Sequence, residues 1–498
     1  MKKLIILPII IGLAFASCNA EMNDKENKKN EYEPNLASLR DHESPEWFHD
    51  LKFGMFIDYG LWSVPGWAPK KEEGAMYPDW YLWRMYTDED FIEYHNKTWG
   101  DDFERDDFIP MFTSEDWDPE ALVNLAIESG MKYVIPFAKH MDGYCLWPSS
   151  YTNRDAVDMT PHEDLIGPLV EECREKGLKF GFYYCIEEWE YPIIGEDDEK
   201  LMRKWPQIEI ESYDEEKYEG RITGKIPVKD FATDYLVPQA NEFIDMYDPD
   251  ILWLDASNAT EQENNHIPEI ISHFYNNAAG RKEVAVNDRW GYDSRTAMGD
   301  FFTSEYHNFH SGSVEGCEDK QLKLMHKWEE NRGISQSFGY NINDTDENII
   351  STKALLEILV KTVSENGNFM LIVNVDSKGA IPDYITKRML DVGKWLKVNG
   401  EAIYNTRPYL VSSDGPNVRY TKSKDGKYVY AICSDYSTNE VKLSSVYLPE
   451  NAKVTLLGTG KQLNWAKETP KGPNIVIEVP ENIEKPAEHA YVLKMEYK

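Results

Sequence analysis

Two acidic residues stand at the ends of short hydrophobic runs, where a strand would hold them rigidly. Asp255 ends the run Ile-Leu-Trp-Leu-Asp, and Glu305 ends the run Asp-Phe-Phe-Thr-Ser-Glu. Glycoside hydrolysis needs two carboxyl groups beside the bond that is cut, about 5–5.5 Å apart for retention of configuration and farther apart for inversion. The two residues are candidates for such a pair. Each also has an ordinary structural use, Asp255 as a turn or helix-capping residue and Glu305 as a surface side chain.

Polar and aromatic side chains also follow most of the other short β-rich runs. They include an acid, a histidine, tyrosines and an arginine, in the segments Asp58-Tyr59, Lys139–Asp142, Tyr183-Tyr184, Asn287–Arg289 and Phe338–Asn341. If these ends surround one cavity, its lining of carboxylates, aromatic rings, an arginine and a histidine suits the binding and cleavage of a sugar.

The elements that must position these residues alternate between strand and helix. Helical patterns with recognisable start and stop residues occupy residues 118–130, 162–176, 351–364 and 383–398. Strands that alternate with helices pair in parallel through right-handed crossovers. We therefore predict a (β/α)8-like barrel of class α/β, with its site at the carboxyl ends of the strands. The predicted strands are Phe53–Tyr59, Lys132–Ala138, Lys179–Cys185, Ile251–Asp255, Glu283–Asn287, Asp300–Glu305, Ile334–Tyr340 and Phe369–Val375.

The pattern changes after Gly400, where short strands follow one another with turn residues between them and no convincing helix. This predicts an antiparallel β-sandwich over residues 401–498, after a catalytic barrel over residues 41–400. The predicted strands of the second domain are Lys427–Cys433, Glu440–Leu448, Lys453–Leu457, Asn474–Val479 and Ala490–Tyr497.

The first 17 residues have the pattern of a secretory signal peptide, with Lys2 and Lys3 ahead of an apolar run. Cys18 follows two small residues, which resembles a bacterial lipoprotein site where that cysteine is lipidated. A plain signal peptide is the alternative. Residues 18–40 are predicted to be a flexible tether. We expect an exported protein of the bacterial periplasm or outer membrane, anchored as a lipoprotein.

The charge of the chain excludes some partners. Lys and Arg number 53 against 88 Asp and Glu, a formal net charge of −35. Such a chain lacks the clustered cations that binding to nucleic acid or to an anionic membrane requires, so we expect no nucleic-acid partner and membrane contact only through the lipid. The cysteines form no Cys-x-x-Cys pair and the first strand ends without a His-x-His, so no metal and no cofactor is predicted. Oligomeric state is not readable from the sequence.

Several blocks of the chain resemble the α-L-fucosidases of glycoside hydrolase family 29, in the same order. The likeness runs from about residue 45 to 405, and the C-terminal β-module fits the same family. It implies an exo-acting retaining glycosidase that removes terminal α-L-fucose, or the closely related α-L-galactose, from a glycan by double displacement. The blocks are Trp47-Phe48 with Phe53–Ile57, Trp80-Tyr81, Ala138–Trp147, Ile251–Asp255, Asn287–Gly291, Thr303–His307 and Ser337–Asn341.

The resemblance also implies residue roles. Asp255 matches the family's nucleophile and Glu305 its acid/base, which protonates the leaving oxygen and then activates water. Tyr184 matches a pocket residue, although Tyr183 beside it points to the other face of the strand. Asp79 stands where the family has Glu. The residues that match positions lining the sugar pocket are Asp58, Asp79, Trp80, His140, Met141, Tyr184, Arg289 and Phe338.

Two of these residues depart from the family. The family normally has His where this chain has Asp58, and a second His where this chain has Met141. Those two histidines help to hold the axial 4-hydroxyl of fucose. L-Fucose is 6-deoxy-L-galactose, and a carboxylate can accept two donors, so Asp58 near O4 could also bind a 6-hydroxyl. The sequence leaves open an α-L-galactosidase, an enzyme for both sugars, and a fucosidase with an altered pocket.

Two other function classes stay under consideration. A metal-dependent barrel hydrolase would need clustered ligands that the strand ends do not offer. A non-catalytic glycan-binding protein on the same fold is the second alternative, which the altered pocket permits. The presence of both Asp255 and Glu305 favours an enzyme.

Overall fold

The computed structural model describes residues 32–71, 74–206, 208–255, 266–291, 294, 297–306, 326–434, 439–469, 474–480, 483 and 486–497. The predicted signal peptide, Cys18 and His307 lie outside these residues. Within them, no helix is both long enough and apolar enough to cross a membrane. The predicted tether is docked in its described part, since Tyr32 N–H donates to Asn276 Oδ1 (2.8 Å) and Leu39 of α2 (Leu36–Leu39) is buried.

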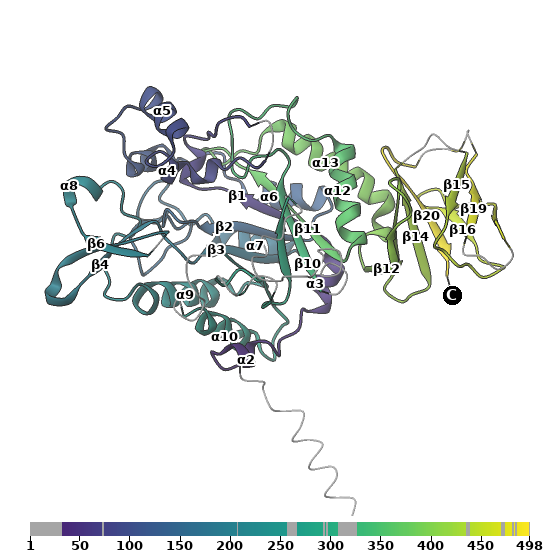
Figure 1. The fold of residues 1–498 in the computed structure, drawn as a ribbon, viewed down its shortest axis with the longest axis horizontal. Helices are drawn as coiled ribbons and strands as arrows, with labels where there is room; N and C mark the ends of the chain where they lie inside the picture. Colours follow the sequence, from purple (N-terminus) through teal and green to yellow (C-terminus); the bar gives the residue numbers. More distant parts are fainter. Residues whose placement is uncertain are drawn as a thin grey trace, which may run out of the picture.

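One curled sheet of eight parallel strands forms the centre of the molecule (Figure 1), the (β/α)8-like arrangement that the sequence predicts. Its order is β8-β7-β3-β2-β1-β11-β10-β9. Several strands are buried along their whole length, because parallel sheets are covered on both faces. The strands are β1 (Phe53–Asp58), β2 (Tyr133–Lys139), β3 (Lys179–Cys185), β7 (Ile251–Asp255), β8 (Ala285–Val286), β9 (Phe302–Glu305), β10 (Trp328–Gly333) and β11 (Gly367–Asn374).

The seventh strand differs from the prediction. The sequence predicts Ile334–Tyr340, whereas β10 spans Trp328–Gly333 with the sequence Trp-Glu-Glu-Asn-Arg-Gly. Its charged residues are of the types usually found on a protein surface, but Glu329 and Glu330 are fully buried. Each has buried partners on neighbouring strands, because Trp253 Nε1 donates to Glu329 (3.0 Å) and Ser304 Oγ donates to Glu330. Buried carboxyl groups with such partners are compatible with a core strand.

Among the described residues, β8 and β9 are the two edges of the sheet, and they meet through side chains and one backbone hydrogen bond rather than through a ladder. Val286 N–H donates to Asp300 Oδ2 and Asp300 N–H donates to Val286 O, each at 2.8 Å. Thr303 donates from its backbone N–H (3.0 Å) and its Oγ1 (2.8 Å) to Asp288 Oδ1. These contacts form the seam of the barrel.

Helices cover the outside of the sheet, and several begin where the sequence predicts. Asp118 Oδ1 accepts from Ala121 N–H (3.0 Å) at the start of α6, and Ser351 Oγ accepts from Ala354 N–H (3.2 Å) at the start of α12. The α-helices after α2 are α3 (Glu46–Leu51), α4 (Tyr81–Arg84), α5 (Glu89–Thr98), α6 (Pro119–Glu128), α7 (Gly167–Glu175), α8 (Glu215–Tyr218), α9 (Val237–Tyr247), α10 (Ile267–Ala278), α12 (Thr352–Ser364) and α13 (Asp383–Asn399). Shorter helical turns are η1 (Leu61–Ser63), η2 (Pro78–Trp80), η3 (Arg105–Met111), η4 (Glu196–Asp198), the π-turn η5 (Ala232–Leu236) and η6 (Gly400–Ala402).

A small antiparallel sheet that the sequence does not predict is inserted between β3 and β7. It consists of β4 (Glu190–Ile194), β5 (Lys200–Lys204) and β6 (Glu209–Ser212). Trp205, just after β5, lies with its ring 5.5 Å from the ring of Trp80. The insertion therefore contributes aromatic surface beside the predicted pocket.

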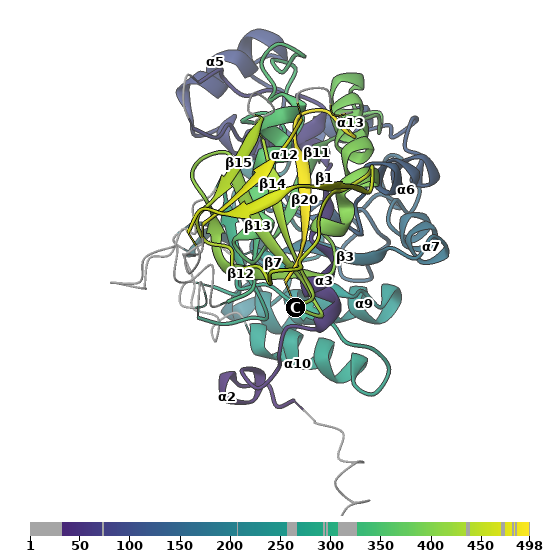
Figure 2. The same ribbon diagram turned by 90° about the vertical axis from the view of Figure 1, so that its right-hand side faces the viewer.

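The C-terminal part is the predicted antiparallel sandwich, with a core of its own. Trp395 Nε1 of α13 donates to Ala490 O (2.9 Å), which fixes it to the barrel. In Figure 1 the sandwich lies at the right of the molecule. The elements α4 and α5, which follow β1, and β4–β6, which follow β3, lie at the left. Figure 2 shows the sandwich in front. The larger sheet holds β12 (Thr406–Ser413), β13 (Val418–Ser423), β14 (Tyr428–Cys433), β20 (Tyr491–Glu496), β16 (Val454–Leu456) and β17 (Lys461–Leu463), and the smaller β15 (Glu440–Leu443), β19 (Ile475–Glu478) and β18 (Trp465–Lys467).

Candidate active site

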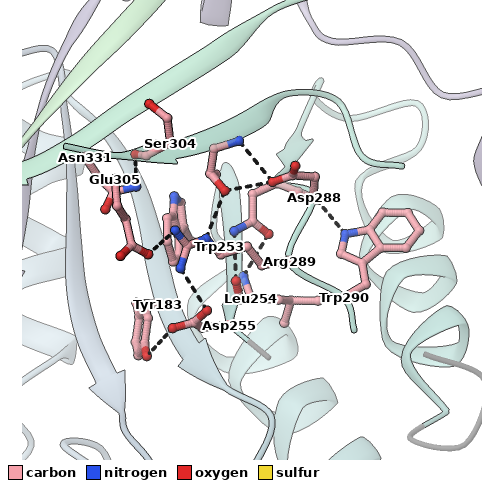
Figure 3. A network of polar contacts seen from close by, with 12 residues as sticks. Tyr183, Trp253, Leu254, Asp255, Asp288, Arg289, Trp290, Ser304, Glu305 and Asn331 are labelled. Atoms are coloured by element: carbon pink, nitrogen blue, oxygen red, sulfur yellow. Dashed lines mark hydrogen bonds and ion pairs between the residues drawn. The ribbon is translucent and has the colours of Figure 1, made fainter. Parts of the chain in front are cut away.

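One arginine joins the two candidate catalytic carboxylates. Arg289 donates from Nη1 to Asp255 Oδ1 (3.1 Å) and from Nη2 to Glu305 Oε1 (Figure 3). Asp255 ends β7 and Glu305 ends β9, so the parallel strands bring together residues that are far apart in the sequence. The side chains of Asp255 and Glu305 are 23 % and 14 % exposed, which leaves both within reach of a substrate.

Arg289 is held in place from three sides. Its Nε donates to Thr303 Oγ1 (2.9 Å) at the seam, and its guanidinium lies 4.7 Å from the centre of the Trp253 ring. Burial lowers the pKa of Arg289, but the carboxylates of Glu305 and Asp255 outweigh burial and hold that pKa above its usual value. The site therefore contains a fixed positive charge between its two acids.

Trp253, under the guanidinium, is itself fixed by a buried acid. Its Nε1 donates to Glu329 Oε1 (3.0 Å), and Tyr133 OH donates to the other oxygen of Glu329. Burial raises the pKa of Glu329 to about 7, although these hydrogen bonds lower it. Glu329 thus holds the Trp253 ring against which the guanidinium of Arg289 lies.

Tyr183, and not Tyr184, reaches the candidate nucleophile. Tyr183 OH donates to Asp255 Oδ2 (2.9 Å), as Figure 3 shows. Tyr184 points to the other face of β3, where its OH donates to Gln239 Oε1 of α9 (2.8 Å). The structure thus removes Tyr184 from the predicted pocket, because successive side chains of a strand alternate between its faces.

Asp58, at the end of β1, is fully buried in the interior beside the pocket. Trp62 Nε1 donates to its Oδ1 (2.7 Å), and the backbone N–H of Gly339 faces the same carboxyl group. Its Oδ2 is buried without a hydrogen-bond partner among the described residues. Burial raises the pKa of Asp58 to about 7, against the effect of the two donors.

Asp79 and His140 lie next to this carboxyl group. Asp79 Oδ2 is 4.0 Å from His140 Nε2, and both side chains are almost fully buried. Within the described chain, Asp79 Oδ1 and His140 Nδ1 have no hydrogen-bond partner. Burial and then the charge of Asp58 raise the pKa of Asp79 well above its usual value, and burial lowers the pKa of His140 to about 3. His140 is therefore neutral here.

Aromatic rings surround these polar groups. The partly exposed ring of Trp80 lies 6.4 Å from that of His140, and Phe338 stacks on Tyr77 with 5.4 Å between ring centres. Met141 is buried, and its carbonyl accepts from Trp189 N–H (3.0 Å). Such walls bind the apolar faces of a sugar ring, while buried carboxyl groups bind its hydroxyls.

Sequence reasoning missed several contacts of this site. The alternation of side chains along a strand places Tyr183 and Tyr184 on opposite faces, so the sequence indicates that only one of the two tyrosines reaches the site. Trp62 and Gly339 follow strand ends as loop residues, and nothing in their spacing marks them as partners of Asp58. The described residues hold no group of three or more His, Cys, Asp or Glu side chains placed as metal ligands.

Comparisons with known proteins identify the family of the chain. Residues 19–401 match the family model "Alpha-L-fucosidase", and residues 413–496 match "Alpha-L-fucosidase C-terminal domain". The tissue α-L-fucosidase of Bos taurus is 30 % identical over 93 % of this chain and 91 % of its own, and the α-L-fucosidase of Dictyostelium discoideum is 29 % identical over 91 % and 92 %.

A solved structure gives the same result for the fold. The α-fucosidase of Thermotoga maritima, in complex with a mechanism-based inhibitor, is 32 % identical with a TM-score of 0.74, over 93 % of this chain and 100 % of its own. The family match covers the strand ends that carry Asp255, Arg289 and Glu305. The chain belongs to the α-L-fucosidase family, and it is a glycoside hydrolase.

Proposed function

We propose that the chain is a retaining, exo-acting α-L-glycosidase with Asp255 as nucleophile and Glu305 as acid/base. The observation that carries this is the single guanidinium of Arg289, which contacts both carboxylates. Two carboxyl groups on one guanidinium are close together, which supports the spacing of about 5–5.5 Å of retaining enzymes over the wider spacing of inverting ones.

The proposed reaction has two displacements. Asp255 attacks the anomeric carbon while Glu305 protonates the leaving oxygen, and a glycosyl–Asp255 ester results. Glu305 then removes a proton from water, which attacks the same carbon and releases the sugar with its configuration retained. Because an ion pair with Arg289 favours a carboxylate, we expect substrate binding to separate Glu305 from Arg289 before the first step.

Tyr183 and Arg289 serve Asp255 in this scheme. Tyr183 OH donates to one carboxylate oxygen and Arg289 to the other, so the attacking group is oriented and its negative charge is stabilised. Neither residue needs to exchange a proton with the substrate.

The experiment is proton NMR of an aryl α-L-fucoside during hydrolysis. The first sugar product should be the α-anomer, and Asp255→Asn should lower kcat by orders of magnitude, about 10³-fold or more. A β-anomer as first product contradicts retention. Tight binding of L-fucose without turnover of any α-L-fucoside would instead indicate a glycan-binding protein.

The cleaved sugar is α-L-fucose or α-L-galactose. A specific observation favours acceptance of galactose: Asp58 replaces the histidine of the family, and its buried Oδ2 has no partner among the described residues. That oxygen can accept from a hydroxyl, and galactose has a 6-hydroxyl that fucose lacks. Comparing kcat/KM on aryl α-L-galactoside and α-L-fucoside decides between them, and a fucoside preference of roughly tenfold or more contradicts the galactosidase.

We also propose that the chain is exported as a lipoprotein of the periplasm or outer membrane and acts there on a glycan. The signal-like residues 1–17 and Cys18 support this. Labelled fatty acid should be incorporated into the protein and lost in Cys18→Ala. Secretion of a soluble protein without fatty acid would indicate a plain signal peptide.

A further inference from the structure

Among the described residues, two buried carboxyl groups near one another, Asp58 and Asp79, have no cation of their own. Asp58 and Asp79 are 0 % and 4 % exposed, and in the described chain neither pairs with a lysine or an arginine. Gly339 lies near both residues. Its backbone N–H faces the carboxyl group of Asp58, and a Cβ atom on Gly339 would lie 3.0 Å from the backbone nitrogen of Asp79. Two ionised carboxylates at such a place are costly, because like charges repel strongly in a buried site.

The hydrogen bonds of the two groups are unequal. Asp58 receives Trp62 Nε1–H at 2.7 Å and faces the N–H of Gly339, whereas Asp79 faces only its own backbone N–H. Donors stabilise a carboxylate over the protonated form. The unequal donors therefore favour Asp58 as the ionised member of the pair.

The other groups that face the pair do not reverse this. His140 is neutral and its Nε2 is 4.0 Å from Asp79 Oδ2. Arg84 of α4 favours ionised Asp79, but Glu305 at the end of β9 disfavours it. Arg289 forms its ion pairs with Asp255 and Glu305. Tyr77, also near Asp79, has its pKa raised by burial and by Glu305, so it stays protonated.

We propose that Asp58 and Asp79 share one proton at neutral pH, which Asp79 carries, so that the pocket offers the sugar one carboxylic-acid donor beside one carboxylate acceptor. This rests on the proposed function of the site. Asp79 Oδ1 and Asp58 Oδ2 are buried without a hydrogen-bond partner within the described chain, so they are the carboxyl oxygens whose hydrogen bonding a bound sugar would complete. A sugar hydroxyl both donates and accepts, so neighbouring hydroxyls can use the two atoms together.

The proposal predicts that sugar binding depends on pH. An ionised carboxylate can only accept hydrogen bonds, so the protonated Asp79 is the one donor of the pair. Raising the pH removes this proton, leaves two acceptors and adds a like charge, so the affinity for the sugar should fall.

The test measures the Kd of L-fucose, and separately of L-galactose, by calorimetry from pH 5 to pH 9. We expect the wild-type affinity to fall by about tenfold or more towards high pH, as one donor is lost. Asp79→Asn imitates the protonated acid, so its Kd should stay within about threefold of the wild-type value at pH 6 and should weaken less towards pH 9 than that of the wild type. Asp79→Ala, which lacks the donor, should bind about tenfold more weakly at pH 6.

Two results overturn the proposal. One is a Kd for Asp79→Asn that is as poor as that of Asp79→Ala at pH 6, because the ionised form would then be the binding form. The other is the same pH dependence in Asp79→Asn and the wild type. Infrared spectra at pH 7 give an independent readout, since the carbonyl band of a protonated carboxylic acid should lose intensity in Asp79→Asn, and an unchanged band contradicts the assignment.

These results are separable from the proposed function. Turnover of the aryl α-L-fucoside and its loss in Asp255→Asn test the glycosidase, whatever Asp79 does. If turnover depends on Asp255 but Asp79→Asn binds poorly, only the shared proton is wrong. If neither sugar binds at any pH and nothing is turned over, both are wrong.

Discussion

Tyr183 and Tyr184 are consecutive in β3, and their hydroxyl groups have unrelated partners on opposite faces of the sheet. Tyr183 OH donates to Asp255 Oδ2 (2.9 Å) and Tyr184 OH donates to Gln239 Oε1 (2.8 Å). The two residues therefore form a matched pair for mutation, since the same atom can be removed from either face of one strand.

Tyr183→Phe should lower kcat by about tenfold to 10³-fold, because it removes one donor from the proposed nucleophile. Tyr184→Phe should leave kcat within about twofold and cost about 1 kcal/mol of stability through the lost hydrogen bond. Steady-state kinetics and urea unfolding of both variants measure this. Equal losses of kcat in the two variants would contradict the assignment of Tyr183.

Arg289→Lys should lower kcat/KM by about 10²-fold or more. A lysine has one point charge and cannot contact Asp255 and Glu305 while also donating to Thr303, as the guanidinium does. The matched control is Arg281→Lys, at an exposed pair with Asp248, which should leave kcat/KM within about twofold. Activity of Arg289→Lys near the wild-type level would show that the bridge is not needed.

Glu329→Gln should remove a pH dependence of stability. The folded-state pKa of Glu329 is raised to about 7 by burial, so the folded protein holds a proton that the unfolded chain releases above about pH 4.5. That stabilisation is complete below the unfolded pKa and is lost as the pH rises towards 7, an effect of roughly 3 kcal/mol. Calorimetric Tm values from pH 4.5 to 8 should fall less in Glu329→Gln than in the wild type.

The control for this experiment is Glu357→Gln on the exposed side of α12, whose side chain is 52 % exposed. Its Tm should follow the wild-type pH profile. A Glu329→Gln profile parallel to that of the wild type would mean that Glu329 is ionised in the folded protein.

Gly339→Ala should reduce kcat/KM by about tenfold or more while it destabilises the fold only modestly. Gly339 has φ +79°, and a Cβ there would lie 3.0 Å from Asp79 N and 3.3 Å from Trp62 Cδ1. Gly415 has φ +71° with open space around a Cβ, so Gly415→Ala carries the same backbone strain, about 1–2 kcal/mol, without touching the pocket. If both variants keep full activity, the pocket tolerates displacement of Asp79.

Much of this architecture could be predicted from short apolar runs. Ile251–Asp255 and Lys179–Cys185 are strands with the predicted bounds, because their apolar residues suit a strand covered on both faces. The carboxyl ends of such strands then bring Asp255, Arg289 and Glu305 together. The fold and the meeting of the candidate catalytic residues therefore follow from the apolar pattern and from the strand topology.

What could not be predicted depends on partners distant in the chain. The sequence of β10 is charged, and its glutamates are buried because they have partners on other strands, among them Trp253, Tyr133 and Ser304. The same holds for Asp58, whose environment is set by Trp62 and by a backbone N–H of Gly339. A single sequence gives the residue types of such pairs but not which of them meet.

The seam between β8 and β9 bears on how the enzyme loses activity when it is heated. Arg289 follows β8 and Glu305 ends β9, so the two sides of the seam carry the two ends of one ion pair. Asp288 and Asp300 close the seam by a few hydrogen bonds, while strand pairs such as β1–β11 have ladders of several residues. Local opening there would separate the proposed catalytic groups while the rest of the sheet stays paired. We therefore expect thermal inactivation to precede unfolding, and substrate analogues that contact both sides to delay it.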